Sequence, residues 1–215
     1  MSRALAGRYR AVAPDLGAGP WEAELDRLEA LAPAEFVLAG YSMGGRLALA
    51  LALRHSERVR ALVLVSASPG LADGEERAAR HAADEALADR IEAIGVEAFA
   101  REWAAQPLFA GQSEEVAALA HEDRLRRSAA EHAAQLRGLG TGVMPPLWDR
   151  LGELTMPVTL VVGARDTKFL AIAWRMAERL PDAEVVVVAG AGHAVALEAP
   201  QAVADAIART HPPVP

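Results

Sequence analysis

Three residues that lie far apart in the sequence could together activate a nucleophile. Ser42 lies in the stretch GYSMG (40–44), directly after one apolar run, whereas Asp166 and His193 each follow a later apolar run. A histidine can accept the proton of a serine hydroxyl, and an aspartate can orient and stabilise the imidazole. The chain order serine, aspartate, histidine is one in which such triads occur. We therefore predict that these three residues form a catalytic triad.

The stretch GYSMG fits the Gly-x-Ser-x-Gly pattern of a nucleophile elbow, a sharp turn that joins a strand to a helix. Glycines suit this turn because the serine is strained and leaves little room for neighbouring side chains. The helix N-terminus favours developing negative charge, so we expect the backbone N–H of Met43 to be an oxyanion donor. Taken singly, the motif also fits a glycine-rich turn, and Asp166 and His193 also fit ordinary loop residues. The coincidence of the three positions favours the triad.

Short apolar runs alternate with helical patterns along the chain and predict an α/β fold, with a mainly parallel sheet covered by helices on both faces. Strands are expected at 36–39, 61–65, 158–162 and 185–188, with a weaker one at 9–13. Helices are expected at 21–31, 45–54, 169–180 and 201–209. Each triad residue would then follow the carboxyl end of a strand, where open α/β sheets bind their ligands.

The stretch from about residue 73 to 140 departs from this alternation. It is rich in Ala, Glu and Arg, contains no convincing strand and is not set apart by a linker. We therefore expect a single domain, 1–215, that carries a helical cap insertion at about 73–140. The tail 210–215 is expected to be frayed.

Composition limits the possible functions. The net charge of the 215 residues is −7, without the concentrated basic face that nucleic acids require. The chain contains no cysteine, no membrane-spanning stretch and no secretory signal at residues 1–8, so we expect a cytoplasmic protein without a membrane span. No histidine pair has metal-ligand spacing, and no glycine cluster fits a nucleotide site, so neither a metal nor a cofactor is predicted. The remaining histidines are interpreted as solvated: His55, His81, His121, His132 and His211.

Several stretches resemble one family within the α/β-hydrolase superfamily. They are Arg46 after the serine motif, GARDTKF (163–169), LGTG (139–142) with PLW (146–148), SPGL (68–71), EERAAR (75–80) and WAAQPLF (103–109). Together they resemble 2-succinyl-6-hydroxy-2,4-cyclohexadiene-1-carboxylate synthase of menaquinone biosynthesis, over nearly the whole chain.

The resemblance implies a lyase that eliminates pyruvate from 2-succinyl-5-enolpyruvyl-6-hydroxy-3-cyclohexene-1-carboxylate, with the triad abstracting a proton and no acyl-enzyme formed. This small-molecule polycarboxylate would need arginines, which bind carboxylates through charge-assisted hydrogen bonds. By position in the matching motifs, the substrate-binding residues would be Tyr41, Arg46, Arg80, Trp103 and Arg124.

Alternatives remain for several of these residues. Each arginine also fits a solvated helix charge, Arg126 or Arg127 could take the place of Arg124, and Trp103 could simply pack between helices. A carboxylic-ester hydrolase with the same triad is the main rival activity, although an esterase for apolar esters has little use for several cations. An inactive hydrolase-fold binding protein is the other rival. The oligomeric state is not predicted.

The start of the chain departs from the family pattern. The family's His-Gly-Phe-like loop, which would hold a second oxyanion N–H, does not occur in the sequence. The stretch 8–16 resembles the strand that normally follows that loop. We therefore expect the N-terminal strands of the fold to be missing, at a cost in rate of the order of 10²–10³.

Overall fold

The computed structural model describes residues 9–211, which form two compact units. The sheet unit comprises residues 9–15, 28–69 and 147–211, and the helical unit comprises residues 16–27 and 70–146. The boundary between residues 27 and 28 lies inside helix α2 (Trp21–Leu31). Whether both units form a single domain stays a prediction. The predictions about a signal at residues 1–8 and about the tail beyond residue 211 lie outside the described residues.

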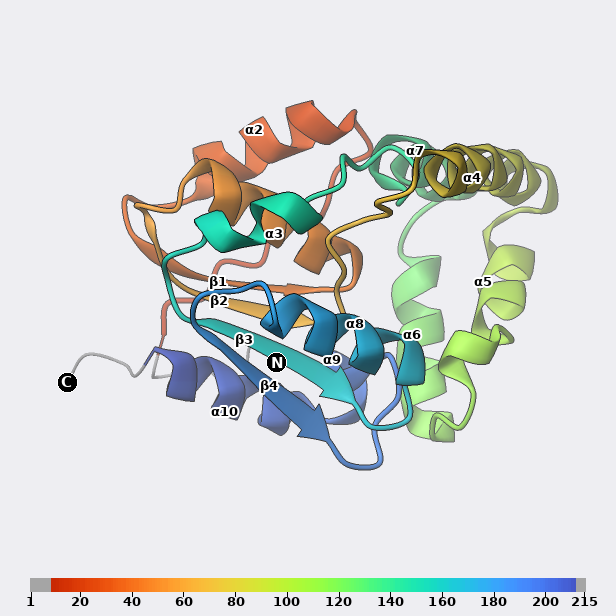
Figure 1. Ribbon diagram of the computed structural model, residues 1–215. Helices are drawn as coiled ribbons and strands as arrows, with labels where there is room; N and C mark the ends of the chain where they lie inside the picture. Colours follow the sequence, from red (N-terminus) through yellow and green to blue (C-terminus); the bar gives the residue numbers. More distant parts are fainter. Residues whose placement is uncertain (1–8, 212–215) are drawn as a thin grey trace. The chain divides into compact units, whose positions relative to one another are not determined.

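The sheet unit is built on four parallel strands in the order β1-β2-β3-β4 (Figure 1). All four strong apolar runs of the sequence are confirmed as strands: β1 (Phe36–Tyr41), β2 (Val59–Val65), β3 (Val158–Gly163) and β4 (Ala183–Val188). Both central strands are buried almost throughout, which explains why their runs are continuously apolar rather than alternating.

The fifth, weaker strand prediction is wrong, because residues 9–13 form no strand. This stretch contains one aliphatic β-branched residue, Val12, whose side chain is largely exposed. Arg10 interrupts the apolar pattern, and Pro14 cannot donate to a ladder of hydrogen bonds. The run therefore buries too little apolar surface to form a strand here.

Helices cover both faces of the sheet. Helix α3 (Met43–Arg54) and helix α10 (Pro200–Thr210) pack on opposite faces (Figure 1). A buried cluster joins α10 to β2 and β3 through Val63, Val161, Val203 and Ile207. The other elements of this unit are η2 (Trp148–Glu153), α8 (Thr167–Ala177) and α9 (Val195–Glu198). All three helices predicted here are confirmed, with ends shifted by up to three residues.

Trp148 at the start of η2 is buried beside two cations. The guanidinium carbon of Arg175 lies 4.2 Å from the centre of the ring, and that of Arg179 lies 5.3 Å from it. Both arginines come from the C-terminal part of α8 and the residues just after it. These cation–π contacts, together with burial of the indole, hold η2 against the end of α8.

The helical unit confirms the predicted helical character of residues 73–140. Its helices are α4 (Gly74–Ile94), α5 (Val96–Ala104), η1 (Pro107–Phe109), α6 (Glu114–Leu125) and α7 (Ala129–Leu139). A small core of Ala88, Ile91, Phe99 and Ala133 joins α4, α5 and α7. Alanine at two of these positions allows the helix backbones to approach closely.

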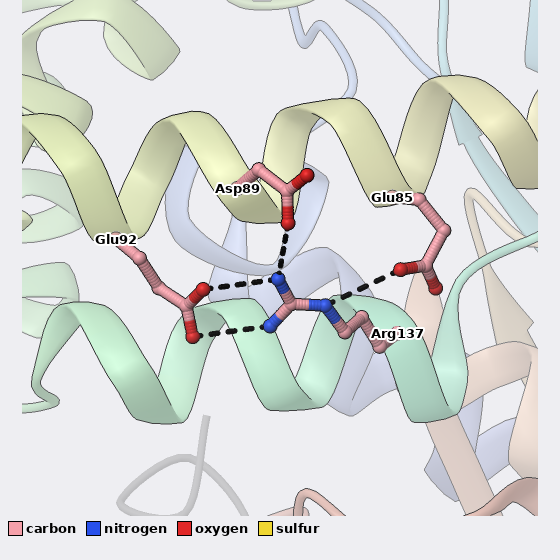
Figure 2. Close-up of polar contacts among 4 residues, drawn as sticks. All are labelled: Glu85, Asp89, Glu92 and Arg137. Carbon is pink, nitrogen blue, oxygen red and sulfur yellow. Dashed lines mark hydrogen bonds and ion pairs between the residues drawn. The ribbon is translucent and has the colours of Figure 1, made fainter.

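Arg137 fastens α7 to α4 at the surface of the helical unit. Its guanidinium donates to Glu85 at 3.3 Å, to Asp89 at 2.6 Å and to both oxygens of Glu92 at 3.0 and 3.1 Å (Figure 2). The three acids share one face of α4, because they are spaced four and three residues apart. The hydrogen bonds to Glu92 and Asp89 raise the pKa of Arg137, and the hydrogen bond from Arg137 lowers the pKa of Glu92.

Glu24 is a buried acid in the part of α2 that belongs to the helical unit. Its carboxylate accepts from the Gly17 backbone N–H at 2.9 Å and from two nitrogens of Arg27 at 2.9 and 2.7 Å. The hydrogen bond from Arg27 lowers the pKa of Glu24, an effect larger than the opposing effect of burial. The carboxylate thereby ties the start of α2 to the segment that precedes it.

Candidate active site

Ser42 occupies a strained turn between β1 and α3. Its φ of 49° and ψ of −111° fall in a region that residues with a side chain rarely adopt, and its backbone N–H donates to the Val65 carbonyl at 2.9 Å. A Cβ at Gly40 would overlap the Gly44 carbonyl, and a Cβ at Gly45 would overlap Ala67. Among the described residues, no atom outside the helix's own backbone lies within 4 Å of a Cβ at Gly44. The crowding thus falls on Gly40 and Gly45, so the second glycine of the motif is not required sterically.

Asp166 follows β3 and begins α8. Its Oδ1 accepts from the backbone N–H of Phe169 at 3.3 Å, which caps the helix. Its Oδ2 lies 2.7 Å from Nδ1 of His193. The carboxylate is buried, so both oxygens face protein donors rather than solvent.

His193 follows β4 and bridges the other two residues. Its Nδ1 faces Asp166, and its Nε2 lies 3.1 Å from Oγ of Ser42. The imidazole is buried and packs against the rings of Phe169 and Tyr41, at centroid distances of 4.5 and 5.6 Å. With Nδ1–H donating to the carboxylate, Nε2 is left to accept the serine proton, an arrangement that can activate a hydroxyl oxygen.

Two further predicted residues stand at the start of α3. Met43 is the first residue of this helix, so its backbone N–H belongs to the positive end of the helix dipole. Arg46 is buried in the same turn, and its backbone N–H donates to the Ser42 carbonyl at 3.1 Å. A buried cation one turn from Ser42 favours the binding of an anionic group there.

In the helical unit, Arg80 is held by a buried acid. Its Nε donates to Oδ1 of Asp84 at 2.7 Å, one turn further along α4. The Asp84 side chain is only 4% exposed, whereas that of Arg80 is 42% exposed. The second oxygen of Asp84 lies 3.4 Å from the Gly142 backbone nitrogen. One edge of the Arg80 guanidinium is therefore fixed.

The three candidate arginines near the end of α6 have different surroundings. Arg124 is half-buried, with its guanidinium carbon 5.5 Å from the Phe109 ring centre and Nη1 donating to the Ala120 carbonyl. Arg126 is largely exposed and lies beside Asp123. Arg127 is half-buried and acts electrostatically on Glu24. A cation–π contact and a backbone hydrogen bond therefore restrain the Arg124 side chain.

Trp103 packs against the core of the helical unit, with its ring centre 5.6 Å from that of Phe99 and 6.4 Å from that of Phe109. These contacts agree with packing between helices, although the ring is only partly buried.

Two of the histidines expected to be solvated have specific partners instead. Nε2 of His55 lies 2.9 Å from Glu29, because His55 ends α3 facing the end of α2. Nε2 of His132 lies 2.8 Å from the Arg124 carbonyl, and its ring packs on Phe99. Within residues 9–211, His, Asp and Glu form no group of three that could hold a metal ion.

Three residues around the Ser42–His193–Asp166 cluster were not among the predicted site residues. Phe169 packs on the imidazole and donates its N–H to Asp166. Arg165 and Glu198 pair with each other at 2.6 Å beside the loops that carry Asp166 and His193. Phe169 and Arg165 are close in sequence to Asp166, which is a weak signal, whereas Glu198 gave none.

Comparison with known proteins identifies the family. Residues 1–206 match the family model described as the alpha/beta hydrolase family. The chain is 43% identical over 167 residues to the "Putative 2-succinyl-6-hydroxy-2,4-cyclohexadiene-1-carboxylate synthase" of Bacillus subtilis, covering 76% of this chain. It is 33% identical over 179 residues to the 2-succinyl-6-hydroxy-2,4-cyclohexadiene-1-carboxylate synthase of Klebsiella pneumoniae, covering 81% of this chain.

Two solved structures resemble this chain over most of its length. MenH from S. aureus superimposes with a TM-score of 0.82 at 28% identity, covering 94% of this chain and 78% of that one. A thermophilic esterase from Thermogutta terrifontis gives a TM-score of 0.70 at 26% identity, covering 93% of this chain and 74% of that one.

The match spans 61% of the Bacillus relative's length and 68% of the Klebsiella relative's length. The sequence and structural likenesses confirm the α/β-hydrolase fold class and the resemblance found in the sequence motifs. This chain belongs to the α/β-hydrolase family and, within it, to the family of 2-succinyl-6-hydroxy-2,4-cyclohexadiene-1-carboxylate synthases.

Proposed function

We propose that this chain is a lyase that eliminates pyruvate from 2-succinyl-5-enolpyruvyl-6-hydroxy-3-cyclohexene-1-carboxylate to give 2-succinyl-6-hydroxy-2,4-cyclohexadiene-1-carboxylate. The observation that carries the proposal is the position of His193, 3.1 Å from Ser42 and 2.7 Å from Asp166, in a chain of this family. This geometry supports a base and not merely a buried polar cluster, because the imidazole has one nitrogen on the acid and the other on the hydroxyl.

The chemistry follows from the substrate. The hydrogen on ring carbon 2 is acidic, because it lies next to the succinyl ketone and is allylic to the ring double bond. His193 takes the Ser42 proton, and the Ser42 oxygen removes this hydrogen. The electron pair moves through the ring, the double bond shifts, and the bond from ring carbon 5 to the enolpyruvyl oxygen breaks. His193 gives the proton that it took from Ser42 to the leaving enolate, which departs as pyruvate, so both residues return to their starting state and no acyl-enzyme is needed.

Negative charge develops on the succinyl ketone oxygen during this step. The Met43 N–H at the N-terminus of α3 is proposed as a donor to that oxygen, since a dipole that is already oriented stabilises charge without reorganisation. We assign Arg46, Arg80 and Arg124 to the carboxylates of the substrate, and Tyr41 and Trp103 to its ring and side chain. Arg46 is supported by its burial one turn from Ser42.

A serine esterase is the second candidate, supported by the structural likeness to the Thermogutta esterase. In an esterase, Ser42 would attack a carbonyl carbon and form an acyl-enzyme, whereas in the lyase it only transfers a proton. The two activities therefore share the triad and differ in whether a covalent intermediate accumulates.

The test is pyruvate release from enzymatically generated substrate, with Ser42→Ala as the control. Release by the wild type that is lost in the variant would support the proposal. A burst of product from an activated aryl ester, without pyruvate release from the natural substrate, would favour the esterase. Absence of both activities would overturn both candidates and leave a binding role.

Among the described residues, no helix is long and apolar enough to cross a membrane. Location in the cytoplasm and the absence of a nucleic-acid partner remain proposals from composition and charge. They are tested by cell fractionation and by retention on immobilised DNA at low salt.

A further inference from the structure

The loops that carry Asp166 and His193 are joined by one buried carboxylate. Oε2 of Glu198 accepts from Nη2 of Arg165 at 2.6 Å and from the backbone N–H of Gly192 at 2.9 Å. Arg165 directly precedes Asp166, and Gly192 directly precedes His193. A single oxygen therefore bridges the neighbours of both residues. We call Glu198, Arg165 and Gly192 the Glu198 bridge.

The carboxylate is positioned by the short helix that follows His193. Helix α9 ends at Glu198, whose backbone N–H donates to the Ala194 carbonyl at 2.9 Å. This single turn directs the side chain back to the loop six residues earlier. The Glu198 side chain is 8% exposed, and burying a charge at that level is unfavourable unless donors compensate it. Both hydrogen-bonding donors lie at Oε2, whereas Oε1 is buried and has no hydrogen-bond partner within residues 9–211.

The two loops approach each other closely. The Arg165 backbone N–H donates to the Ala191 carbonyl at 2.9 Å, and a Cβ on Gly163 would overlap the carbonyl oxygens of Ala191 and Gly192. The Glu198 bridge adds a side-chain connection to this backbone contact. The 2.7 Å contact between Asp166 and His193 requires the two loops to keep this spacing. The spacing matters for activity, because displacement of a catalytic group by 1 Å can reduce the rate by about 10²-fold.

We propose that Glu198 is a positioning residue that holds the Asp166 and His193 loops together through Arg165 and the Gly192 N–H. It acts on the imidazole through these neighbours and does not take part in proton transfer. This inference rests on the proposed function, because it assumes that His193 acts as the base. Either candidate activity would depend on Glu198 in the same way.

A matched pair of substitutions separates the acceptor from the size of the side chain. Glu198→Met keeps the length and removes the acceptor, whereas Glu198→Gln keeps one acceptor oxygen for both donors. We expect kcat for pyruvate release to fall on the order of 10–100-fold in the Met variant, with KM changed less than about threefold. The Gln variant should keep kcat within about fivefold of the wild type.

A second readout does not depend on the substrate. The His193 Nδ1 proton, held between nitrogen and carboxylate, should give a separate low-field resonance in the proton NMR spectrum. We expect this resonance to persist in the Gln variant and to broaden or shift in the Met variant. If the wild type shows the resonance but releases no pyruvate, the proposed function fails. The resonance in the Gln and Met variants then still decides whether Glu198 positions His193.

Two further variants keep the test decidable. Arg165→Ala removes an exposed partner and should reduce kcat by a few-fold even if Glu198→Met fails to fold. Glu153→Met is the control, because it breaks an ion pair with Arg150 in the same unit. This ion pair is remote from Ser42, since Arg150 also contacts the Leu53 carbonyl at the opposite end of α3. The proposal is overturned if folded Glu198→Met keeps the kcat and the low-field resonance of the wild type. If the Met variant does not fold, the same result in Arg165→Ala overturns it.

Discussion

The two units hold their buried charged groups by different means. In the sheet unit, the Ser42–His193 contact joins residues 151 apart in the chain, and the His193–Asp166 contact joins residues 27 apart. In the helical unit, the buried acids Glu24 and Asp84 pair with arginines three and four residues away. The register of a parallel sheet sets the first kind of contact, and the periodicity of a helix sets the second. The sheet unit should therefore be the more sensitive to backbone displacement and the helical unit to loss of charge.

The sharpest test of this contrast uses two glycines of the serine motif. Gly40→Ala places a Cβ on the Gly44 carbonyl, which belongs to the backbone and cannot move without displacing Ser42. We expect pyruvate release to fall by about 10²-fold or more and stability to fall by about 3 kcal/mol. Activity and urea unfolding measure the two effects.

Gly44→Ala is the matched control for stability. No packed atom in the described part of the chain lies within 4 Å of its Cβ, and alanine favours a helix over glycine by up to about 1 kcal/mol. We therefore expect the same or a higher free energy of unfolding. Similar destabilisation by both substitutions would contradict the assigned crowding.

Substitution of Asp84 in the helical unit should mainly weaken substrate binding, because this acid positions Arg80. Asp84→Asn leaves the Arg80 guanidinium without its charged partner. We expect KM to rise about 10-fold with kcat nearly constant, since a charged hydrogen bond is worth about 1.5–3 kcal/mol. Arg80→Met should raise KM at least as much.

Arg77→Met is the control, because Arg77 lies one turn before Arg80 on α4. An equal rise in KM for the Arg77 and Arg80 variants would mean that the general charge of α4 matters and not a specific contact.

The contribution of Glu24 to the stability of the helical unit should depend on pH. Its folded-state pKa is lowered by the hydrogen bond from Arg27, so its ionised form contributes stability above the ordinary value of 4.5, and this contribution is lost as pH falls through the lower folded value. Glu24→Gln should reduce the free energy of unfolding by about 1–3 kcal/mol at pH 7, and the difference should shrink below pH 4.5. Denaturant unfolding across pH measures it, with the exposed Glu97→Gln as control. A pH-independent difference would point to packing instead.

The smallest effect is expected at the Arg137 contacts in Figure 2. Arg137→Met leaves Glu85, Asp89 and Glu92 on one face of α4 without their cation, so the unfolding temperature should fall by on the order of a few degrees at low salt. In 1 M salt, where the Debye length is about 3 Å, this difference should narrow. Arg150→Met in the sheet unit provides an exposed ion-pair control. A difference that persists at high salt would contradict an electrostatic origin.

The contrast also explains what the sequence could reveal. The four strands were predictable because buried parallel strands are continuously apolar, and the positions of Asp166 and His193 just after such runs pointed to one edge of the sheet. Asp84 could have been found from its helical spacing to Arg80. Glu198 could not, because its partners lie six and 33 residues away and no local pattern marks them. The crowding at Gly45 in place of Gly44 was equally hidden, since it depends on Ala67 from the next strand-to-helix connection.

The four tryptophans are divided evenly between the units, and this has an optical consequence. Trp148 lies near two guanidinium groups in the sheet unit, whereas Trp103 lies near two aromatic rings in the helical unit. Indole emission depends on neighbouring charge and on solvent, so the two residues should fluoresce with different maxima and quench differently with iodide. Once Trp21 and Trp174 are replaced by Phe, the loss of order around Trp148 and around Trp103 can therefore be followed separately, without an introduced label.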